Sequence, residues 1–247
     1  MKARERHKLK ENDFVESVAK AREALFARPR EVTTMVVLVV VVLVAAGGYI
    51  GWRVGRTTKA TTLLAQALVV AEAPVVTPPP PAPGSPPPVQ QPGTYRTDRD
   101  RADAALPRLM QAADAYPNTE PGITARYRAA GMLAELGRYA EAEQRYREVI
   151  DKAGRSSIYG RTARLGLGET LAAEGKTDEA IATFRELSTD TESQLPLDGV
   201  LMQLGRAAMQ GGKIEDATRA FTRVVDEFPQ SLYVSEAKEK LQQLKKA

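Results

Sequence analysis

The residue types that most often carry enzymatic chemistry are scarce in this sequence. Its 247 residues include no cysteine and a single histidine, His7, in the N-terminal segment. A nucleophile–base triad needs an imidazole or thiol beside its partners, and structural zinc sites use cysteine and histidine ligands. We therefore predict no catalytic residue, no metal site and no cofactor site, and a protein that is not an enzyme.

Two short motifs resemble parts of catalytic sites by their letters alone. Gly175-Lys176-Thr177 matches the end of a phosphate-binding loop, but Thr170 stands where the first glycine of that motif belongs. The segment is also expected between two helices, whereas a phosphate loop joins a strand to a helix. Ser17-Val-Ala-Lys20 matches one motif of penicillin-binding enzymes without the companion motifs that complete the site. We interpret both matches as coincidences.

Internal repeats dominate the second half of the chain. Four segments align with a period of 37 or 38 residues, and each has a small residue followed four positions later by a large apolar one. These pairs are Ala105/Leu109, Ala142/Tyr146, Ala180/Phe184 and Ala217/Phe221. Small residues let two helices approach closely, and glycine supplies the left-handed turn between them. Because one helix hairpin leaves an apolar face uncovered, the pattern predicts a stack of hairpins.

The repeat pattern resembles the tetratricopeptide repeat, although the tryptophan of the first-helix signature is missing and some loops are longer. The resemblance implies an all-α helix-hairpin solenoid, capped by a terminal helix over Ser231–Leu244. It also implies protein partners that bind an inner wall formed by the first helix of each hairpin. Methionine and aromatic side chains adapt to varied partners, and arginine binds carboxylates. The repeat alignment places six residues in this candidate peptide-binding groove: Tyr127, Leu165, Glu169, Met202, Arg206 and Met209.

One stretch, residues 32–52, is predicted to be a transmembrane helix. It has no charged residue, and at about 1.5 Å per residue it spans roughly the 30 Å of a bilayer core. Tyr49 and Trp52 stand at its far end, where aromatic rings favour the headgroup level. A signal peptide cleaved near Ala46 is disfavoured, because a long charged segment precedes the stretch and the apolar run continues through Ile50. A buried core helix would show a polar face.

Within that stretch and just after it, three glycines recur at four-residue spacing. Gly47, Gly51 and Gly55 share one helix face, and such faces allow close packing of helices in lipid. We predict candidate membrane-helix packing here, either in a homodimer or against the helix of a partner. The alternative is that glycine is simply frequent in membrane helices.

The other segments are divided by composition. Ten of the sixteen prolines fall between Ala73 and Gly93, and proline at this density favours extended backbone. This tract is either a free stalk or, as we favour, an insertion between the two helices of the first hairpin. The expected organisation is a cytosolic amphipathic segment (1–31), the transmembrane helix (32–52), a juxtamembrane helix that would be the first helix of the repeat domain (53–72), the proline-rich linker or insertion (73–96) and the repeat domain with its C-terminal capping helix (97–247).

The net charge of +4 is concentrated beside the apolar stretch. From Tyr95 onward 23 basic residues face 24 acidic ones, so the repeat domain has no evident basic stripe and no nucleic-acid partner is predicted. The basic flanks suit anionic membrane lipid. The short basic N-terminus and long C-terminal domain favour a cytoplasmic N-terminus and, in a bacterium, a periplasmic repeat domain anchored in the inner membrane.

The whole architecture resembles the ancillary subunit of the bacterial SecYEG translocon. The similarity includes the N-terminal run Arg6-His7-Lys8-Leu9-Lys10-Glu11-Asn12-Asp13-Phe14, the single span and the repeat domain, while the proline tract departs from it. This resemblance implies a scaffold that assists translocation or hands secreted proteins to periplasmic chaperones. Two alternatives remain: a scaffold for outer-membrane or peptidoglycan assembly, and a transmembrane regulator that acts through the cytosolic helix Glu11–Arg28.

Overall fold

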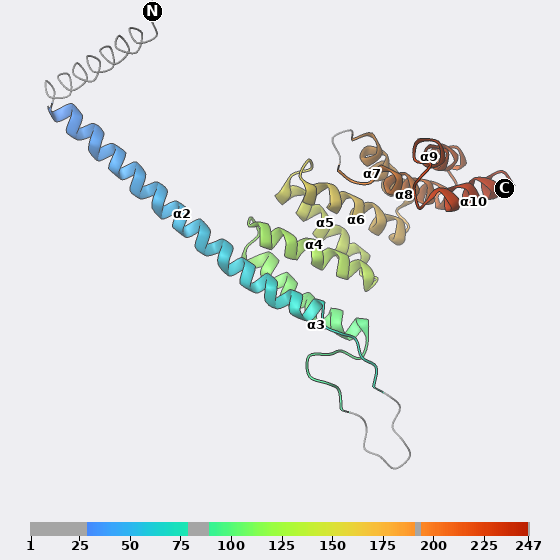
Figure 1. The fold of residues 1–247 in the computed structure, drawn as a ribbon, viewed down its shortest axis with the longest axis horizontal. Helices are drawn as coiled ribbons and strands as arrows, with labels where there is room; N and C mark the ends of the chain where they lie inside the picture. Colours follow the sequence, from blue (N-terminus) through green and yellow to red (C-terminus); the bar gives the residue numbers. More distant parts are fainter. Residues whose placement is uncertain (1–28, 79–88, 191–193, 247) are drawn as a thin grey trace, which may run out of the picture. The chain divides into compact units, whose positions relative to one another are not determined.

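The computed structural model describes residues 29–78, 89–190 and 194–246 (Figure 1). The expectations for residues 1–28 and for the middle of the proline-rich tract, 79–88, lie outside the described residues. The described chain is helical, and its β-type pairing is an isolated bridge between Val75 and Tyr95. Its helices are α2 (Pro29–Ala71), α3 (Asp98–Ala115), α4 (Glu120–Glu135), α5 (Tyr139–Ala153), α6 (Ile158–Glu174), α7 (Thr177–Thr189), α8 (Leu197–Gln210), α9 (Ile214–Glu227) and α10 (Val234–Leu244).

Helix α2 is a single helix of 43 residues that takes part in two compact units. The first unit ends at Gly55 and the second begins at Arg56. In the first unit the large apolar side chains from Met35 to Val44 are all exposed. Over Thr33–Ala71 the helix is long and apolar enough to cross a membrane by length and composition, and it is the one such helix in the described part of the chain.

The C-terminal part of α2 belongs to the core of the second unit. Ala60 and Ala67 are fully buried, and Ala67 shares an apolar cluster with Leu106 and Leu109 of α3. The end of α2 and α3 therefore form the first helix hairpin of the stack (Figure 1). The interpretation of residues 53–72 as the first repeat helix is consistent with this packing.

The two ends of the proline-rich tract are held together at the base of that hairpin. Val76 N–H donates to the carbonyl of Tyr95 at 2.8 Å, and Tyr95 N–H donates to the carbonyl of Pro74 at 3.0 Å. Thr77 Oγ1 donates to the carbonyl of Arg96 at 3.3 Å. The tract therefore leaves and rejoins the fold at one place, which favours an insertion over a free stalk.

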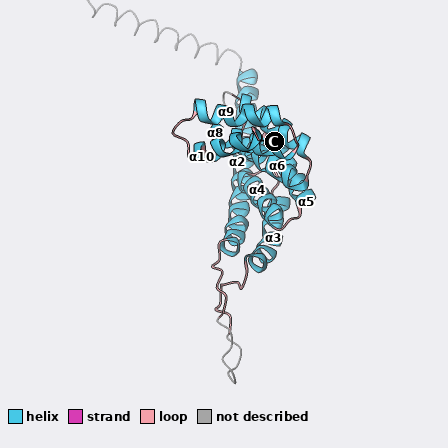
Figure 2. Ribbon diagram, turned by 90° about the vertical axis from the view of Figure 1, so that its right-hand side faces the viewer, coloured by secondary structure: helices cyan, strands magenta, loops and turns pink. Residues whose placement is uncertain are grey.

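Three further hairpins follow, and Figure 2 shows the described chain as helices joined by loops, with a long connection between α2 and α3. Each hairpin, α4–α5, α6–α7 and α8–α9, turns at a glycine with positive φ: Gly137 (75°), Gly175 (88°) and Gly212 (67°). We call α4, α6 and α8 the first-helix face and α3, α5, α7 and α9 the second-helix face. The structure confirms an all-α hairpin solenoid with a long apolar N-terminal helix.

The core shows why small residues recur in the first helices. Phe184 and Phe221 are buried rings, and each lies against a glycine of the preceding helix in its hairpin. A Cβ at Gly168 would stand 2.6 Å from Phe184 Cε1, and one at Gly205 would stand 2.5 Å from Phe221 Cε1. Both distances are far below van der Waals contact, so the aromatic rings use the space that a side chain would fill.

The terminal helix begins later than the sequence pattern predicts. It starts at Val234, whereas the expected helix started at Ser231, and Leu232 is 98% exposed. Residues 229–233 form turns and a bend instead, and Ser231 N–H donates to the carbonyl of Phe228 while Val234 N–H donates to that of Ser231. Ser231 Oγ also donates to Asp198 Oδ2 at 2.6 Å, which ties this turn to the start of α8.

Candidate functional site

The predicted groove residues lie on α4, α6 and α8, the three helices of the first-helix face. The first helices also align on a small residue, which is Ala130 in α4, Gly168 in α6 and Gly205 in α8. Tyr127, Leu165 and Met202 occupy equivalent repeat positions, three residues before this aligned small residue. Tyr127 and Leu165 are half-buried and pack against the apolar core. The Tyr127 ring stands edge-on to the ring of Tyr146, with the centroids 5.9 Å apart. Both residues therefore contribute to packing as well as to the surface.

The prediction that Met202 lines the groove is wrong. Its side chain is 0% exposed, so it offers no surface to a partner. The physical reason is that consecutive first helices contact one another, and an apolar side chain at that contact is more stable out of water. Met209 is half-buried and packs against the same core.

Glu169 and Arg206 are the two predicted residues that the structure brings together. Both line a pocket of ≈370 Å³ between α6 and α8, together with Ala172, Ala173, Phe184, Gln203, Ala207 and Gln210. Gln203 Nε2 donates to Glu169 Oε1 at 2.8 Å, and Gln210 Nε2 donates to the carbonyl of Ala172 at 3.2 Å. The pocket is thus bordered by amide and charged groups, which can replace these internal hydrogen bonds with hydrogen bonds to a peptide.

The two charged residues of this pocket, Glu169 and Arg206, have different partners. Desolvation raises the pKa of Glu169, while the hydrogen bond from Gln203 and the charge of Arg206 oppose that shift. Arg206 forms a two-pronged ion pair with Glu236 of α10, with its Nη2 2.7 Å from Oε2 and its Nε 3.0 Å from Oε1. The hydrogen bond from Arg206 lowers the pKa of Glu236. Arg206 therefore links the last repeat to the terminal helix. The spacing of the repeats in the sequence did not indicate this ion pair with Glu236.

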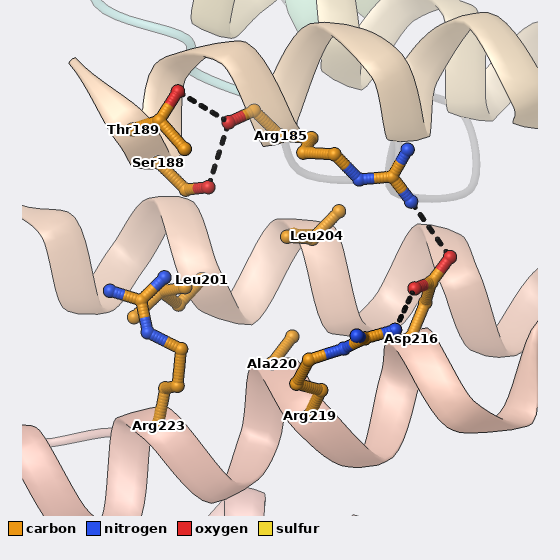
Figure 3. Close-up of a pocket in the computed structure, with 9 residues that line it drawn as sticks. All are labelled: Arg185, Ser188, Thr189, Leu201, Leu204, Asp216, Arg219, Ala220 and Arg223. Carbon is orange, nitrogen blue, oxygen red and sulfur yellow. Dashed lines mark hydrogen bonds and ion pairs between the residues drawn. The ribbon is translucent and has the colours of Figure 1, made fainter.

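Sequence reasoning missed the grooves of the second-helix face. One of them, of ≈370 Å³, lies between α7 and α9 over a floor formed by Leu201, Leu204 and Ala220 (Figure 3). Asp216 accepts from Arg185 Nη2 and from Arg219 Nη2, each at 2.7 Å. The hydroxyls of Ser188 and Thr189 point to the carbonyl of Arg185, as Figure 3 shows, and donate to it at 2.8 and 3.3 Å.

A second groove, of ≈590 Å³, lies one repeat earlier, between α5 and α7. It is lined by Arg147, Ile150, Asp151, Gly154, Arg155, Arg164, Leu167, Thr183 and Glu186. A repeated charge pair was the signal available in the sequence: an arginine five residues after the aligned alanine, and an acid just before the next one. It appears as Arg147–Glu179 at 3.4 Å and as Arg185–Asp216 at 2.7 Å.

The three glycines of α2 lie on an open surface. No described atom stands within 4 Å of the place where a Cβ would be added at Gly47, Gly51 or Gly55. Close approach of another helix at this face is sterically feasible, and packing there, in a homodimer or with a partner, stays a prediction. Among the described residues there is no group of three or more His, Cys, Asp or Glu side chains that could hold a metal ion.

Comparison with known proteins gives a family and a fold. A family model described as a tetratricopeptide repeat-like domain matches residues 30–246. Among solved structures, the tetratricopeptide-like repeats of a putative kinesin light chain from Podosopora anserina are 16% identical, cover 60% of this chain and 86% of their own, and superpose with a TM-score of 0.49. MamA from Desulfovibrio magneticus RS-1 is 18% identical, with 60% and 86% coverage and a TM-score of 0.45. No curated protein matches the sequence.

Proposed function

The chain belongs to the tetratricopeptide repeat-like domain family, and from this premise we propose that it is a membrane-anchored scaffold for protein–protein interaction. Repeats of this kind generally bind other proteins, and the fold is typically non-catalytic. The observation that supports the proposal is that the two parts of helix α2 differ in their surroundings. Its first part exposes apolar side chains continuously, and its last part is buried in the first hairpin of the repeat domain. One helix thus tethers the binding domain to lipid.

The finer proposal concerns the place and the partners. We propose a bacterial inner-membrane protein with a cytoplasmic N-terminus and a periplasmic repeat domain, which assists protein translocation or hands secreted proteins to chaperones. The support is the resemblance of the single-span architecture and the N-terminal run to the ancillary translocon subunit. The partners expected on the first-helix face are translocon subunits or periplasmic chaperones.

Site-specific photo-crosslinking in native membranes tests this proposal. A photoreactive amino acid at Gln210, which lines the pocket between α6 and α8, should capture translocon subunits or periplasmic chaperones identified by mass spectrometry. The same amino acid at Glu239, exposed on α10 and outside this pocket, is the matched control. Adducts at Gln210 that contain only outer-membrane or cell-wall assembly factors would overturn the translocation role.

The two alternative functions gain less from the structure. A scaffold that reaches toward the outer membrane was favoured by a free proline-rich stalk, and the hydrogen bonds between Val76 and Tyr95 instead favour an insertion closed at its base. A regulator acting through the cytosolic helix depends on residues 11–28, which lie outside the described residues.

A further inference from the structure

The second-helix face contains repeat-equivalent grooves whose residues can be compared position by position. Three residues after the aligned alanine, Arg145 of α5 is replaced by Thr183 in α7 and by Ala220 in α9. Four residues before the aligned small residue of each first helix stand Arg126, Arg164 and Leu201. The first pair of positions lies between α3 and α5, the second between α5 and α7, and the third between α7 and α9. The chain therefore carries three versions of one site.

In the first version a buried arginine lies beside two carboxylates, Asp114 and Glu148, although its Nε and Nη1 form no hydrogen bond in the described part of the chain. Arg126 is 4% exposed, its Nη2 donates to the carbonyl of Ala113 at 3.0 Å, and its Nε lies 3.0 Å from Glu148 Oε2. Arg145 Nη1 lies 3.0 Å from both Glu148 Oε2 and Asp114 Oδ1, so it bridges α3 and α5. Two arginines thus meet two carboxylates, and burial of the positive charge is balanced within the fold.

In the second version the corresponding arginine pairs with one carboxylate, which it shares with a second arginine. Arg164 is 8% exposed, and its Nη2 lies 3.4 Å from Glu186 Oε2, the oxygen that Arg155 Nη2 already approaches at 2.6 Å. Arg164 Nε is buried and has no hydrogen-bond partner in the described part of the chain. Asp151, the counterpart of Asp114, pairs instead with its neighbour Lys152. A buried donor without an acceptor is costly, since its hydration is lost without replacement.

The space above this arginine is open where the second repeat has Thr183 in place of the bridging Arg145. Thr183 is too short to bridge α5 and α7 as Arg145 bridges α3 and α5, and its hydroxyl donates to the carbonyl of Glu179 at 2.8 Å. The resulting groove of ≈590 Å³ is lined by Arg164 together with Arg147, Arg155, Ile150 and Leu167. Burial lowers the pKa of Arg164 against the opposing charges of Glu186 and Asp190, and the nearby positive charge of Arg155 adds to this lowering. A negatively charged guest would relieve both.

We propose that the groove between α5 and α7 binds the carboxylate of a glutamate side chain from an acidic segment of a partner protein. The guest carboxylate supplies Arg164 with the acceptor that Asp114 and Glu148 supply to Arg126, because guanidinium groups bind carboxylates by charge-assisted hydrogen bonds. The methylene stem of the glutamate packs on Ile150 and Leu167. The proposal deepens the scaffold function and rests on it, by assigning a second surface and the chemistry of its ligand.

A protein carboxylate fits this site better than nucleic acid does. Three arginines line the groove, but Asp151 and Glu186 line it too. From Tyr95 onward the chain carries 23 basic and 24 acidic residues, and nucleic-acid binding needs a broad basic surface. The buried guanidinium of Arg164 inside a nearly neutral domain favours one localised acidic group over an extended anionic chain.

Two substitutions that copy other repeats test the proposal with little risk to folding. Arg164→Leu installs the residue found at Leu201, and Thr183→Arg installs the residue found at Arg145. Thr222→Arg adds the same charge at an exposed position of α9 outside the groove, and it is the matched control. The full chain in lipid nanodiscs is titrated into a dye-labelled, end-blocked hexaglutamate peptide, and binding is followed by fluorescence anisotropy, with hexaglutamine as the neutral peptide.

Hexaglutamate should bind the native chain and the Thr222→Arg variant alike, and binding to Arg164→Leu and to Thr183→Arg should weaken by about tenfold or more. Weaker binding to Thr183→Arg is the sharpest result, since general charge attraction predicts stronger binding. Equal affinity for all four proteins, equal binding of hexaglutamine, or no binding of hexaglutamate to the native chain would overturn the inference. Crosslinks at Gln210 are read separately, so loss of this inference alone leaves them intact.

Discussion

At the scale of single residues, the stack depends on small side chains placed opposite large ones. Gly205 faces the buried ring of Phe221 and Gly168 faces that of Phe184, whereas Gly131 has ordinary space around it. A Cβ at Gly131 would meet only Tyr146 Oη, at 3.5 Å. The same change of glycine to alanine should therefore have opposite effects at these positions.

Gly205→Ala should lower the free energy of unfolding by about 1–3 kcal/mol, because the added methyl group overpacks a rigid aromatic contact. Gly131→Ala should leave it unchanged or raise it by up to about 1 kcal/mol, through better helix propensity. Urea unfolding followed by circular dichroism measures both. Equal destabilisation by the two variants would show that the aromatic contact is not the cause.

Burial also makes one tyrosine sensitive to alkali. Desolvation raises the pKa of Tyr146, and the negative charges of Glu169 and Glu135 add smaller contributions. A raised pKa means that the folded state holds the proton more tightly, so stability is fully present below the unfolded pKa of about 10 and is lost as pH rises above it. Unfolding free energies measured between pH 8 and pH 11 should fall above pH 10. In Tyr146→Phe the fall should be shallower, and an unchanged slope would contradict the prediction.

At the scale of elements, the first hairpin is closed by backbone hydrogen bonds between residues on either side of the proline-rich tract. Val76 and Tyr95 pair directly, and Arg101 Nη1 donates to the carbonyl of Ala73 at 3.4 Å. These contacts position the end of α2 on α3 independently of the intervening tract. The tract is therefore expected to contribute little to the stability of the domain.

Deleting residues 79–88 should leave the unfolding free energy of the repeat domain within about 0.6 kcal/mol, because loop-closure entropy changes slowly with loop length. Val76→Pro is the contrasting variant, since it removes the N–H that donates to Tyr95 and should weaken the first hairpin. Hydrogen exchange of the α3 amides measures this locally. Increased exchange throughout α3 after the deletion would instead indicate that the tract is part of the folded hairpin.

At the scale of the whole molecule, the candidate membrane span and the repeat domain share helix α2, so the place of truncation matters. A chain beginning at Arg53 keeps Ala60, Leu63 and Ala67, which cover the apolar face of α3. A chain beginning at Ala73 loses them and exposes Leu106 and Leu109. Exposed apolar area of this kind promotes aggregation.

The chain beginning at Arg53 should leave the membrane fraction and remain folded and monodisperse. The chain beginning at Ala73 should unfold at lower temperature or aggregate. Membrane fractionation, circular dichroism and light scattering compare the two proteins. If both truncated chains were equally stable, the end of α2 would not be part of the repeat domain, and a separate stalk would be the better description.

The sequence by itself determined the helices, their turns and the class of fold. The period of small and large residues depends on contacts within one hairpin, and Gly137, Gly175 and Gly212 have the positive φ that their turns require. Such local requirements repeat in every unit, so they are visible as spacing. The absence of cysteine, the single histidine and the long apolar stretch are likewise properties of composition.

Only the tertiary structure decided which side chains remain available to a partner. Met202 shares its repeat position with Tyr127 and Leu165, yet it alone is fully buried, and Arg206 is engaged by Glu236 of the terminal helix. Arg126 and Arg164 are the same residue at the same repeat position, but Arg126 pairs with Asp114 and Glu148, whereas Arg164 pairs with Glu186, which Arg155 also contacts. These differences arise because burial and charge pairing depend on the neighbouring helices, whose residues change from repeat to repeat while the period stays the same.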